Sequence, residues 1–593
     1  MKSTHFEVKY SNWFILFILP FLLYCQPKGG LEKDGPRIDL EENGGLFLPE
    51  GFEATAVVNQ LKGQARHIAV NNNGDIYVKL RSPHDNGGNA VLRDINGDGK
   101  ADSIKYFGDY PVHGRYGTGM RIYHGYLYYS SQTTVYRQKL NPGKMLPHPN
   151  IEIIVDEHFD KKSREHIGKP LAFDNKGNLY VPFGAPSNAC QDPKRTPGAA
   201  GLDPCPQLEH FGGIWKFDAN KLNQFQEDGE RFASGIRSLV CLEWNDADNN
   251  LYTVMHGRDD LLRLFPNHFS PWESAMLPSE EFIKVTKASD FGWPYCYYDQ
   301  MINKKVLAPE YGGDGEIVGR CGDYEDPIMG FPGHWAPNGL LFYKGDQFPE
   351  KYKKGAFVAF HGSTNRAPYP QAGYFIGFVP FEHGAPKGII EIFADGFARV
   401  DTIVNVRDAV FRPMGLAEGP DGALYVSETE KGAIWKIEFK GNPKNFGPKH
   451  LLQMKMRENL PHFKTPDINL SRIQTNVAPE ALLYNTYCSA CHQQDGMGDQ
   501  ARFPPLSQSE WVIGDKEILI GIILNGQEGE MQVLDRMYNN VMPKHDFLTD
   551  AQIANILSYI RTNFNNNASK ITAQEVGNVR AKINMAPDVE GSL

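Results

Sequence analysis

A repeated turn-and-strand pattern constrains the fold of residues 46–440 more than any other feature. Five segments carry a turn rich in Asn, Asp and Gly and then a short apolar strand: "NNNGDIYVKL", "YHGYLYYSS", "DNKGNLYVPFG", "DADNNLYTVMHG" and "GPDGALYVSE". Further strands follow, among them "VLRDI", "IWKFD", "LLRLF" and "IWKIEF". Alternating β-branched and aromatic residues between turns predict antiparallel sheet. Repeats of this length predict a β-propeller of about six blades; a pair of large β-sandwiches is the alternative.

Composition places the chain among ordinary globular proteins. It has 593 residues, of which 41% are hydrophobic and 22% charged, so we expect more than one domain. The formal net charge of −10 argues against nucleic acid as a partner. No interior apolar run is long enough to span a bilayer.

A haem-attachment motif lies near the end of the chain. Cys488 and Cys491 are followed by His492 in "CSACH", a C-x-x-C-H spacing. One helical turn brings both thiols to the haem vinyl groups and directs the histidine at the iron. A zinc or redox C-x-x-C pair is the alternative, but there is no second pair and no βαβ setting. The motif therefore predicts a c-type haem bound by these three residues.

The sequence that follows resembles the C-terminal half of small class I cytochromes c. A Met-Pro pair begins at Met542, and an amphipathic helix capped by Thr549 comes after it. The resemblance implies that Met542 is the second axial ligand, opposite His492. Met531 and Met537 are weaker candidates, because most methionines fill cores.

The first residues resemble an export signal. Lys2 and Lys9 precede the apolar run "WFILFILPFLLY", which is too short for an ordinary spanning helix, and Cys25 follows. A cysteine at this place resembles a bacterial lipoprotein signal, although Tyr24 departs from the small residue that such signals carry. We expect export to the periplasm or to a membrane-anchored form, which agrees with covalent haem attachment outside the cytoplasm.

Five cysteines remain after the signal and the haem motif. In an oxidising compartment we expect Cys190 to pair with Cys205 across a Pro- and Gly-rich loop, and Cys296 with Cys321 across another Gly-rich loop. Cys241 lies in the apolar stretch "SLVCLEW" and is expected to be a buried free thiol.

A turn early in the propeller region has the spacing of a calcium loop. Asp94, Asn96, Asp98 and Asp102 fall at alternate positions of "RDINGDGKAD", and Gly99 allows the turn. Hard oxygen ligands at such spacing suit Ca²⁺. The Glu that completes an EF-hand is missing, so a structural calcium site is predicted against the alternative of an unliganded turn.

Motifs in a fixed order then indicate a family. "HIGKPLAFDNKGNLYVPFGAPSNACQDPKRTPG", "GERFASGIRSLVCLEW", "HGRDDL", "DFGWPYCYYD", "HWAPNGLLFY", "FHGSTNRAP" and "FRPMGLAEGPDGALYVSE" occur in that order over nearly all of residues 46–440. Together they resemble the sorbosone/pyranose dehydrogenase branch of the soluble quinoprotein glucose dehydrogenase family. The resemblance implies a six-bladed propeller that binds pyrroloquinoline quinone (PQQ) and Ca²⁺ and oxidises aldoses or similar carbonyl hydrates.

The same resemblance implies site residues. His166 matches the general base of the family, and Arg237 the arginine that polarises the quinone carbonyl. The family usually has Asn after that arginine, where this chain has Ser238. Gly257 and Arg258 match a turn whose carbonyls hold the catalytic Ca²⁺. Three further matches are looser: Arg366 and Arg412 against the PQQ carboxylates, and Trp335 stacked on cofactor or sugar, with a surface or blade-core role as the alternative.

These inferences divide the chain into six parts. They are 1–25 as a signal, 26–45 as a linker, 46–440 as the propeller dehydrogenase, 441–475 as an ordered strap, 476–565 as the cytochrome c domain and 566–593 as a loosely held tail. We expect a mainly β protein with a small all-α domain.

The expected function is a PQQ-dependent sugar dehydrogenase that passes electrons to its own haem and then to a soluble cytochrome, quinone or respiratory complex. A calcium-dependent, lactonase-like propeller hydrolase and a sugar-binding propeller with an attached cytochrome are the alternatives. The fused cytochrome favours the redox function, because a hydrolase has no use for an electron acceptor.

Overall fold

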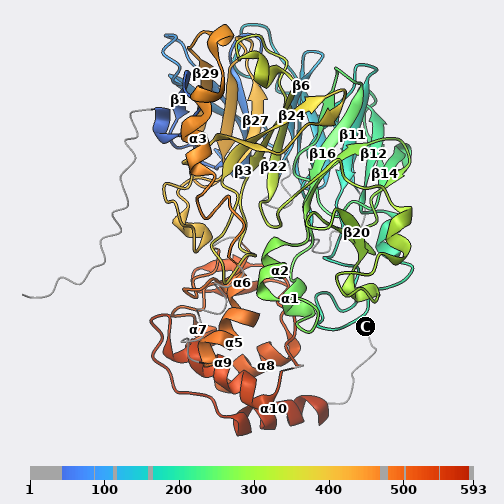
Figure 1. Ribbon diagram of the computed structural model, residues 1–593, viewed down its shortest axis with the longest axis vertical. Coiled ribbons are helices and arrows are strands. Elements are labelled where there is room, and N and C mark those ends of the chain that lie inside the picture. Colours follow the sequence, from blue (N-terminus) through green and yellow to red (C-terminus); the bar gives the residue numbers. More distant parts are fainter. Residues whose placement is uncertain are drawn as a thin grey trace, which may run out of the picture. The chain divides into compact units, whose positions relative to one another are not determined.

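The computed structural model describes residues 43–85, 87–110, 117–157, 165–467, 479–499, 502–546 and 548–585. The predicted signal and Cys25 lie outside these residues. The described residues belong to one compact unit, in which β1–β29 form one body and helices α5–α10 another (Figure 1). No helix among the described residues combines the length and apolarity needed to cross a membrane.

Six sheets of four or five strands make up the propeller within the described ranges. Two of them, in hydrogen-bonded order, are β2 (Ala65–Val70), β3 (Ile76–His84), β4 (Gly87–Arg93), β5 (Ser103–Phe107); and β13 (Gln224–Phe225), β9 (Glu152–Asp156), β8 (Thr134–Lys139), β7 (Tyr126–Ser130), β6 (Met120–Tyr123). Two more are β10 (Ala172–Phe173), β11 (Asn178–Phe183), β12 (Gly213–Asp218), β14 (Glu230–Ser234), β18 (Ser289–Asp290); and β15 (Glu243–Asn245), β16 (Asn250–Met255), β17 (Glu280–Val285), β21 (Met329–Phe331).

The fifth sheet contains β22 (Pro337–Phe342), β23 (Gly355–Phe360), β24 (Phe375–Glu382), β25 (Ala385–Pro386) and β26 (Glu391–Ala394). The sixth contains β1 (Phe52–Val58), β29 (Ile434–Phe439), β28 (Leu424–Glu428) and β27 (Pro413–Glu418). The predicted six-bladed propeller is confirmed, and the β-sandwich alternative is wrong.

The sixth sheet closes the ring. Its β1 comes from the start of the propeller and pairs antiparallel with β29 from the end, with Phe52 opposite Phe439. Phe52 packs edge-on against Phe348 and Phe393, with ring centroids 4.9 and 5.1 Å away. Such edge contacts suit the charge distribution of aromatic rings.

The inner strands are buried on both faces because each blade packs between two others. β23, for example, has the sequence "GAFVAF" and is buried along its whole length. This explains why many strands read as continuous apolar runs and do not alternate strictly between apolar and polar residues.

Two insertions interrupt the fourth sheet. The short helices α1 (Leu261–Leu264) and α2 (Pro271–Met276) lie between β16 and β17, and the hairpin of β19 (Cys296–Asp299) and β20 (Lys304–Leu307) lies between β17 and β21. The predicted disulfides Cys190–Cys205 and Cys296–Cys321 are both confirmed. Cys241 is a buried free thiol, as expected.

The described part of the strap packs on the propeller. It begins with the 3-10 helices η8 (Pro443–Asn445) and η9 (Pro448–Leu451) and continues into α3 (Leu452–Arg457). Arg457 forms an ion pair with the buried Asp395, and His462 Nε2 lies 3.1 Å from the other carboxylate oxygen of Asp395. The remaining 3-10 helices are η1 (Asn43–Gly45), η2 (Pro206–Glu209), η3 (Gln226–Asp228), η4 (Pro309–Tyr311), η5 (Gly319–Asp323), η6 (Glu350–Lys353) and η7 (Val406–Asp408).

The C-terminal domain is helical. Its elements are α5 (Pro479–Tyr487), α6 (Ser489–His492), α7 (Glu510–Ile513), α8 (Lys516–Asn525), the hairpin β30 (Met531–Val533) and β31 (Arg536–Tyr538), α9 (Asp550–Thr562) and α10 (Ala573–Met585). α9 begins with the predicted Thr549 cap, whose hydroxyl accepts the Gln552 N–H. The prediction of a loose tail is wrong as far as residue 585, because α10 packs on α8 and α9 and buries Val576 and Val579.

Ring closure predicts that Phe52 contributes strongly to the stability of the propeller. Replacing the buried Phe52 by Ala leaves a cavity among five aromatic rings, so we expect the free energy of unfolding of the propeller to fall by about 3–5 kcal/mol. Phe225, whose ring is 43% exposed, is the matched control, and Phe225→Ala should cost less than about 1 kcal/mol. Denaturant unfolding followed by tryptophan fluorescence measures both; equal losses would contradict the closure argument.

Candidate functional site

The haem-attachment residues lie at and within α6: Cys488 joins α5 to α6, and Cys491 and His492 belong to α6. The Cys488 N–H donates to Tyr484 O over 2.8 Å, and the His492 N–H donates to Cys488 O over 2.9 Å. This helical path places both cysteines and His492 along one cavity. Burial raises the pKa of each thiol to about 12, unlike the low-pKa thiolates of redox C-x-x-C pairs.

His492 is held in the orientation of an axial ligand. Its Nδ1 lies 2.9 Å from the carbonyl oxygen of Pro504. In the tautomer with the proton on Nδ1, this nitrogen donates to the carbonyl, and the lone pair of Nε2 is available to bind a metal. Burial lowers the pKa of His492, and this favours the neutral imidazole that ligation needs.

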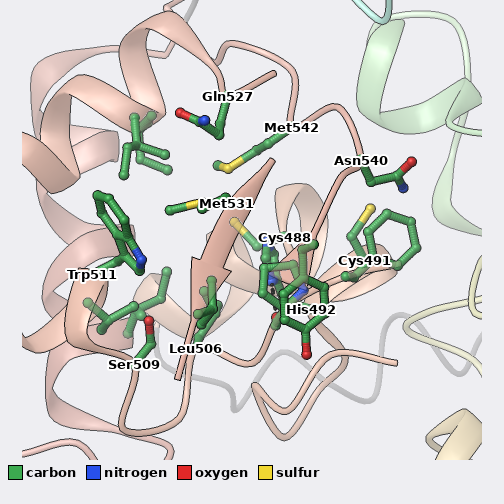
Figure 2. Close-up of a pocket in the computed structure, with 18 of the residues that line it drawn as sticks. Cys488, Cys491, His492, Leu506, Ser509, Trp511, Gln527, Met531, Asn540 and Met542 are labelled. Atoms are coloured by element: carbon green, nitrogen blue, oxygen red, sulfur yellow. Dashed lines mark hydrogen bonds between the residues drawn. The ribbon is translucent and has the colours of Figure 1, made fainter. Parts of the chain in front are cut away.

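The cavity is large and mostly apolar. It contains about 1080 Å³ of empty space, part of it open to solvent. Figure 2 shows Cys488, Cys491 and His492 at the cavity together with Trp511, Met531 and Met542. Further lining residues are Tyr487, Leu506, Val512, Leu519, Ile523, Val533, Tyr538, Leu557 and Ile560, and Arg263 reaches the cavity from the propeller. Its size and lining suit a flat apolar macrocycle.

Two of the three candidate methionines reach this cavity. Met542 and Met531 both line it, and Figure 2 shows their side chains directed into it. The backbone of Met542 is fixed by two hydrogen bonds of 2.8 Å with Gln527. Met537 is 47% exposed and is absent from the described lining. Met542 as the second axial ligand stays a prediction, with Met531 as its structural rival.

In the propeller, Arg237 lies at the centre of a buried polar cluster. Its Nη1 donates to Gly257 O over 2.7 Å, and its Nη2 donates to Asn188 Oδ1 over 2.8 Å and to Asp259 Oδ2 over 2.9 Å. A longer bond joins Nε to Asn188 O, so four of the five N–H donors are used. The guanidinium is thereby held rigidly, and together with Gly257 it lines a second, smaller cavity.

His166 lies close to this cluster and is held as a neutral base. Its Nδ1 is 2.7 Å from Ala185 O, which again leaves Nε2 as the reactive nitrogen. Burial and the charge of Arg237 hold the pKa of His166 well below its ordinary value. An imidazole in this state can accept a proton at neutral pH.

A chain of charged residues continues from Arg237. Asp259 binds Arg237 and also accepts from Asn365 Nδ2 over 2.6 Å. Arg195 contacts Glu165 at 2.6 Å and Asp259 at 3.3 Å, and it forms a short ion pair with Asp260. Burial opposes ionisation of Asp259, but the charges of Arg237 and Arg195 hold its pKa below the ordinary value.

The predicted Gly257–Arg258 turn is fixed from two sides. The Gly257 N–H donates to Glu280 Oε2 over 3.0 Å, while the other carboxylate oxygen of Glu280 accepts from Ala336 over 3.1 Å. Burial raises the pKa of Glu280 to about 7. Arg258 forms a buried ion pair with Glu310. Since the Gly257 carbonyl already accepts from Arg237, calcium ligation by this turn stays a prediction.

The two arginines expected at the PQQ carboxylates differ. Arg366 is 1% exposed, and its Nε and Nη1 have no hydrogen-bond partner in the described ranges. Burial lowers its pKa to about 10. Arg412, by contrast, donates to the carbonyls of His361 and Gly362 and lies 3.4 Å from Glu430. The unpaired donors of Arg366 suit an anionic group, whereas Arg412 is already engaged.

Trp335 lies in the core between blades. It contacts Phe360 and Phe375 edge-on, with ring centroids 5.2 Å away in each case. These contacts favour the blade-core role that the sequence left as the alternative. His256 binds Pro337 O over 2.9 Å and also lines the smaller cavity.

The predicted calcium loop is an exposed turn held by its own backbone. Asp94 accepts from the N–H groups of Gly97 and Gly99, at 2.7 and 2.8 Å. Asp102 accepts from Ile95 over 2.6 Å. Among the residues that the structure describes, no three His, Cys, Asp or Glu side chains gather as a metal site. The calcium site at Asp94, Asn96, Asp98 and Asp102 therefore stays a prediction.

Comparison with known proteins identifies both modules. Residues 46–440 match the model of the TrAA12-like family, and residues 480–564 match that of cytochrome c. The chain belongs to the TrAA12-like family and carries a C-terminal cytochrome c domain. Cytochrome c-552 of Thermus thermophilus is 38% identical over 105 residues, which are 16% of this chain and 79% of that protein. The cytochrome subunit of a Gluconobacter japonicus fructose dehydrogenase is 32% identical over 118 residues, which are 18% of this chain and 23% of that subunit.

Solved structures agree on the propeller fold. The calcium structure of a Trichoderma reesei carbohydrate-active enzyme of family AA12 is 18% identical, with a TM-score of 0.54 over 68% of this chain and 99% of its own. The holo form of the pyranose dehydrogenase PQQ domain from Coprinopsis cinerea is also 18% identical, with a TM-score of 0.52 over 66% of this chain and 97% of its own. At 18% identity, the structural similarity establishes a shared fold and nothing more.

Sequence reasoning missed several residues of the polar cluster. The sequence motifs assign no role to Asn188, Arg195, Glu165 or Asp260. The only signal was the charged pair in "HGRDDL". The partners of that pair are distant along the chain, so only the fold brings them together.

The two methionines in the cavity predict a clear contrast. If Met542 is the axial ligand, Met542→Ala should keep covalent haem but lose thioether support for the reduced state. We expect the equilibrium constant for haem reduction in this variant to fall at least about tenfold, which lowers the midpoint potential by about 59 mV for one electron. Met531→Ala is the matched control and should change the same constant by less than about twofold. Spectroelectrochemical titration measures both variants, and the reverse result would make Met531 the axial ligand.

Proposed function

We propose that this protein is a dehydrogenase that oxidises an aldose or a related carbonyl hydrate with PQQ and passes the electrons to its own c-type haem. The observation that carries the proposal is the pairing of two sites in one chain. A preformed haem cavity stands beside a propeller with a buried neutral His166 next to a fixed Arg237. The shared fold of the pyranose dehydrogenase PQQ domain from Coprinopsis cinerea supports the same function.

The residues present fit an anionic quinone cofactor. PQQ carries three carboxylates, and Arg366 offers two buried donor nitrogens that have no partner among the described residues. A guanidinium pairs well with carboxylates through parallel N–H bonds. Arg366 would hold one carboxylate, whereas Arg412 would first have to release its carbonyl partners.

His166 would act as the general base. PQQ, when bound, would supply the hydride acceptor for the substrate carbon. His166 would accept the hydroxyl proton of the substrate at Nε2, since Nδ1 is engaged by Ala185 O. Burial and the charge of Arg237 lower the pKa of His166, so the resting imidazole is neutral, and the imidazolium that forms would release its proton to solvent before the next turnover.

Arg237 would supply fixed positive charge. Its position is set by Asn188, Gly257 and Asp259, and it has one N–H left for a ligand oxygen. A preoriented cation stabilises negative charge where that charge develops, and it needs no reorganisation during the reaction. The Gly257–Arg258 turn as a calcium site and the sorbosone-type substrate are finer parts of this proposal.

The proposed location is outside the cytoplasm, with Cys25 as a lipid anchor. Three sequence features support it: the charged and then apolar N-terminal run, the C-x-x-C-H motif and two disulfide-bonded loops. Electrons would leave the haem for a soluble cytochrome, quinone or respiratory complex.

A direct experiment tests the overall function. Purified protein with covalent haem is incubated with PQQ and Ca²⁺, and a panel of aldoses is added while the haem spectrum is recorded. We expect haem reduction that requires both PQQ and a sugar. Absence of reduction across a broad panel, with the haem still reducible by dithionite, would overturn the proposal.

His166→Gln tests the base. General-base removal typically costs about 10²–10⁴ in rate, so sugar-driven haem reduction should fall at least about a hundredfold. Reduction of the haem by an artificial donor should stay within about threefold of wild type, because that step needs no sugar proton. His210→Gln, at a side chain that is 42% exposed, is the matched control. Stopped-flow spectroscopy separates the two rates, and near-normal sugar oxidation in His166→Gln would make His166 structural.

A further inference from the structure

One arginine of the propeller faces the haem cavity of the cytochrome domain. Arg263 belongs to α1, which contacts α5. Its side chain is only 4% exposed, and it lines the same cavity as Cys491 and His492. The side chain is therefore part of the haem environment although it comes from the other module.

Arg263 is held on one side and unpaired on the other. Its Nε and Nη2 bind the two carboxylate oxygens of Asp260, over 3.0 and 2.6 Å. Its Nη1 is buried and has no hydrogen-bond partner within the part of the chain that the structure describes. A buried guanidinium nitrogen without a partner is costly, so a ligand in the cavity would gain by accepting from it.

Asp260 joins Arg263 to the polar cluster of the propeller. It also pairs with Arg195, which contacts Asp259 at 3.3 Å, and Asp259 accepts from Arg237 over 2.9 Å. These contacts form one continuous chain of ion pairs from Arg237 to Arg263. This series of ion pairs, together with Glu165, contains three carboxylates and three guanidiniums and has no formal net charge.

Separate contacts hold the haem-binding loop against the propeller. Asp495, three residues after His492, accepts from Asn405 Nδ2 over 2.8 Å and from Arg407 Nη2 over 3.0 Å. Gln494 donates to Pro368 O over 3.3 Å. The approach of Arg263 to the cavity is thus one of several contacts between the modules.

We propose that Arg263 is a haem-facing residue through which the propeller sets the reduction potential of the haem, and that Asp260 balances its charge. An oxidised haem iron carries one more positive charge than a reduced one, so a nearby fixed cation favours the reduced state. The neighbouring carboxylate opposes that effect. This inference needs only the haem and not the sugar reaction, so its failure and that of the proposed function are distinguishable.

Opposite charge changes at the two positions provide the test. Arg263→Gln leaves Asp260 uncompensated, so the equilibrium constant for haem reduction should fall about tenfold, or about 59 mV in midpoint. Asp260→Asn leaves Arg263 uncompensated and should raise the constant by about the same factor. The double variant restores the charge balance and should lie within about threefold of wild type. Spectroelectrochemical titration of the full chain with its covalent haem measures all three.

Two further variants separate charge from structure. Arg263→Lys keeps the charge and should stay within about threefold of wild type, while Arg320→Gln, at an exposed pair with Asp203, should leave the midpoint unchanged. If Arg263→Gln does not yield folded protein, Asp260→Asn and Arg263→Lys still carry the test. Shifts of the same sign at both positions, or shifts below about twofold, would overturn the proposal.

Discussion

The pairing of β1 with β29 is the constraint on which the rest of the structure depends. A propeller is a ring, and each blade packs between two neighbours, so an unclosed ring would expose apolar faces at both ends. The Phe52–Phe439 register closes it with the first strand of the chain's propeller against the last. The strap leaves from the same place, and Glu50 N–H binds His450 O over 2.9 Å. The propeller ring is therefore closed in the same region from which the strap leads to the cytochrome domain.

The candidate site uses buried charges, which are costly unless they are paired. Arg237, Arg195 and Arg263 are each nearly buried, and each has at least one carboxylate partner. Pairing offsets desolvation and also fixes the side chains, because Asp259 and Asp260 each bind two guanidiniums. Arg366 is the exception, since two of its nitrogens have no partner. Arg366, whose charge is the least compensated of the four arginines, therefore suits an anionic ligand.

Sequence predicted what depends on local pattern and missed what depends on distant contacts. The turn-and-strand repeat indicated the propeller, and the C-x-x-C-H spacing indicated the haem turn, because each is set by neighbouring residues. Asp260 and Arg195 are 65 positions apart, so their contact had no local signal. α10 was missed because its sequence is largely polar, and only the groove between α8 and α9 explains its few buried residues. The choice between Met531 and Met542 likewise depends on how a loop and a hairpin meet.

The distribution of cysteines has a consequence for how the molecule matures. Four thiols have to be oxidised in pairs, while Cys488 and Cys491 have to remain reduced until haem is attached. The four oxidised cysteines share one buried cluster with Trp293 and Tyr295 in the propeller, and the haem pair belongs to another domain. The two disulfides and the attachment pair are thus separated both along the chain and between domains, so the native fold places no disulfide cysteine in the cluster that contains Cys488.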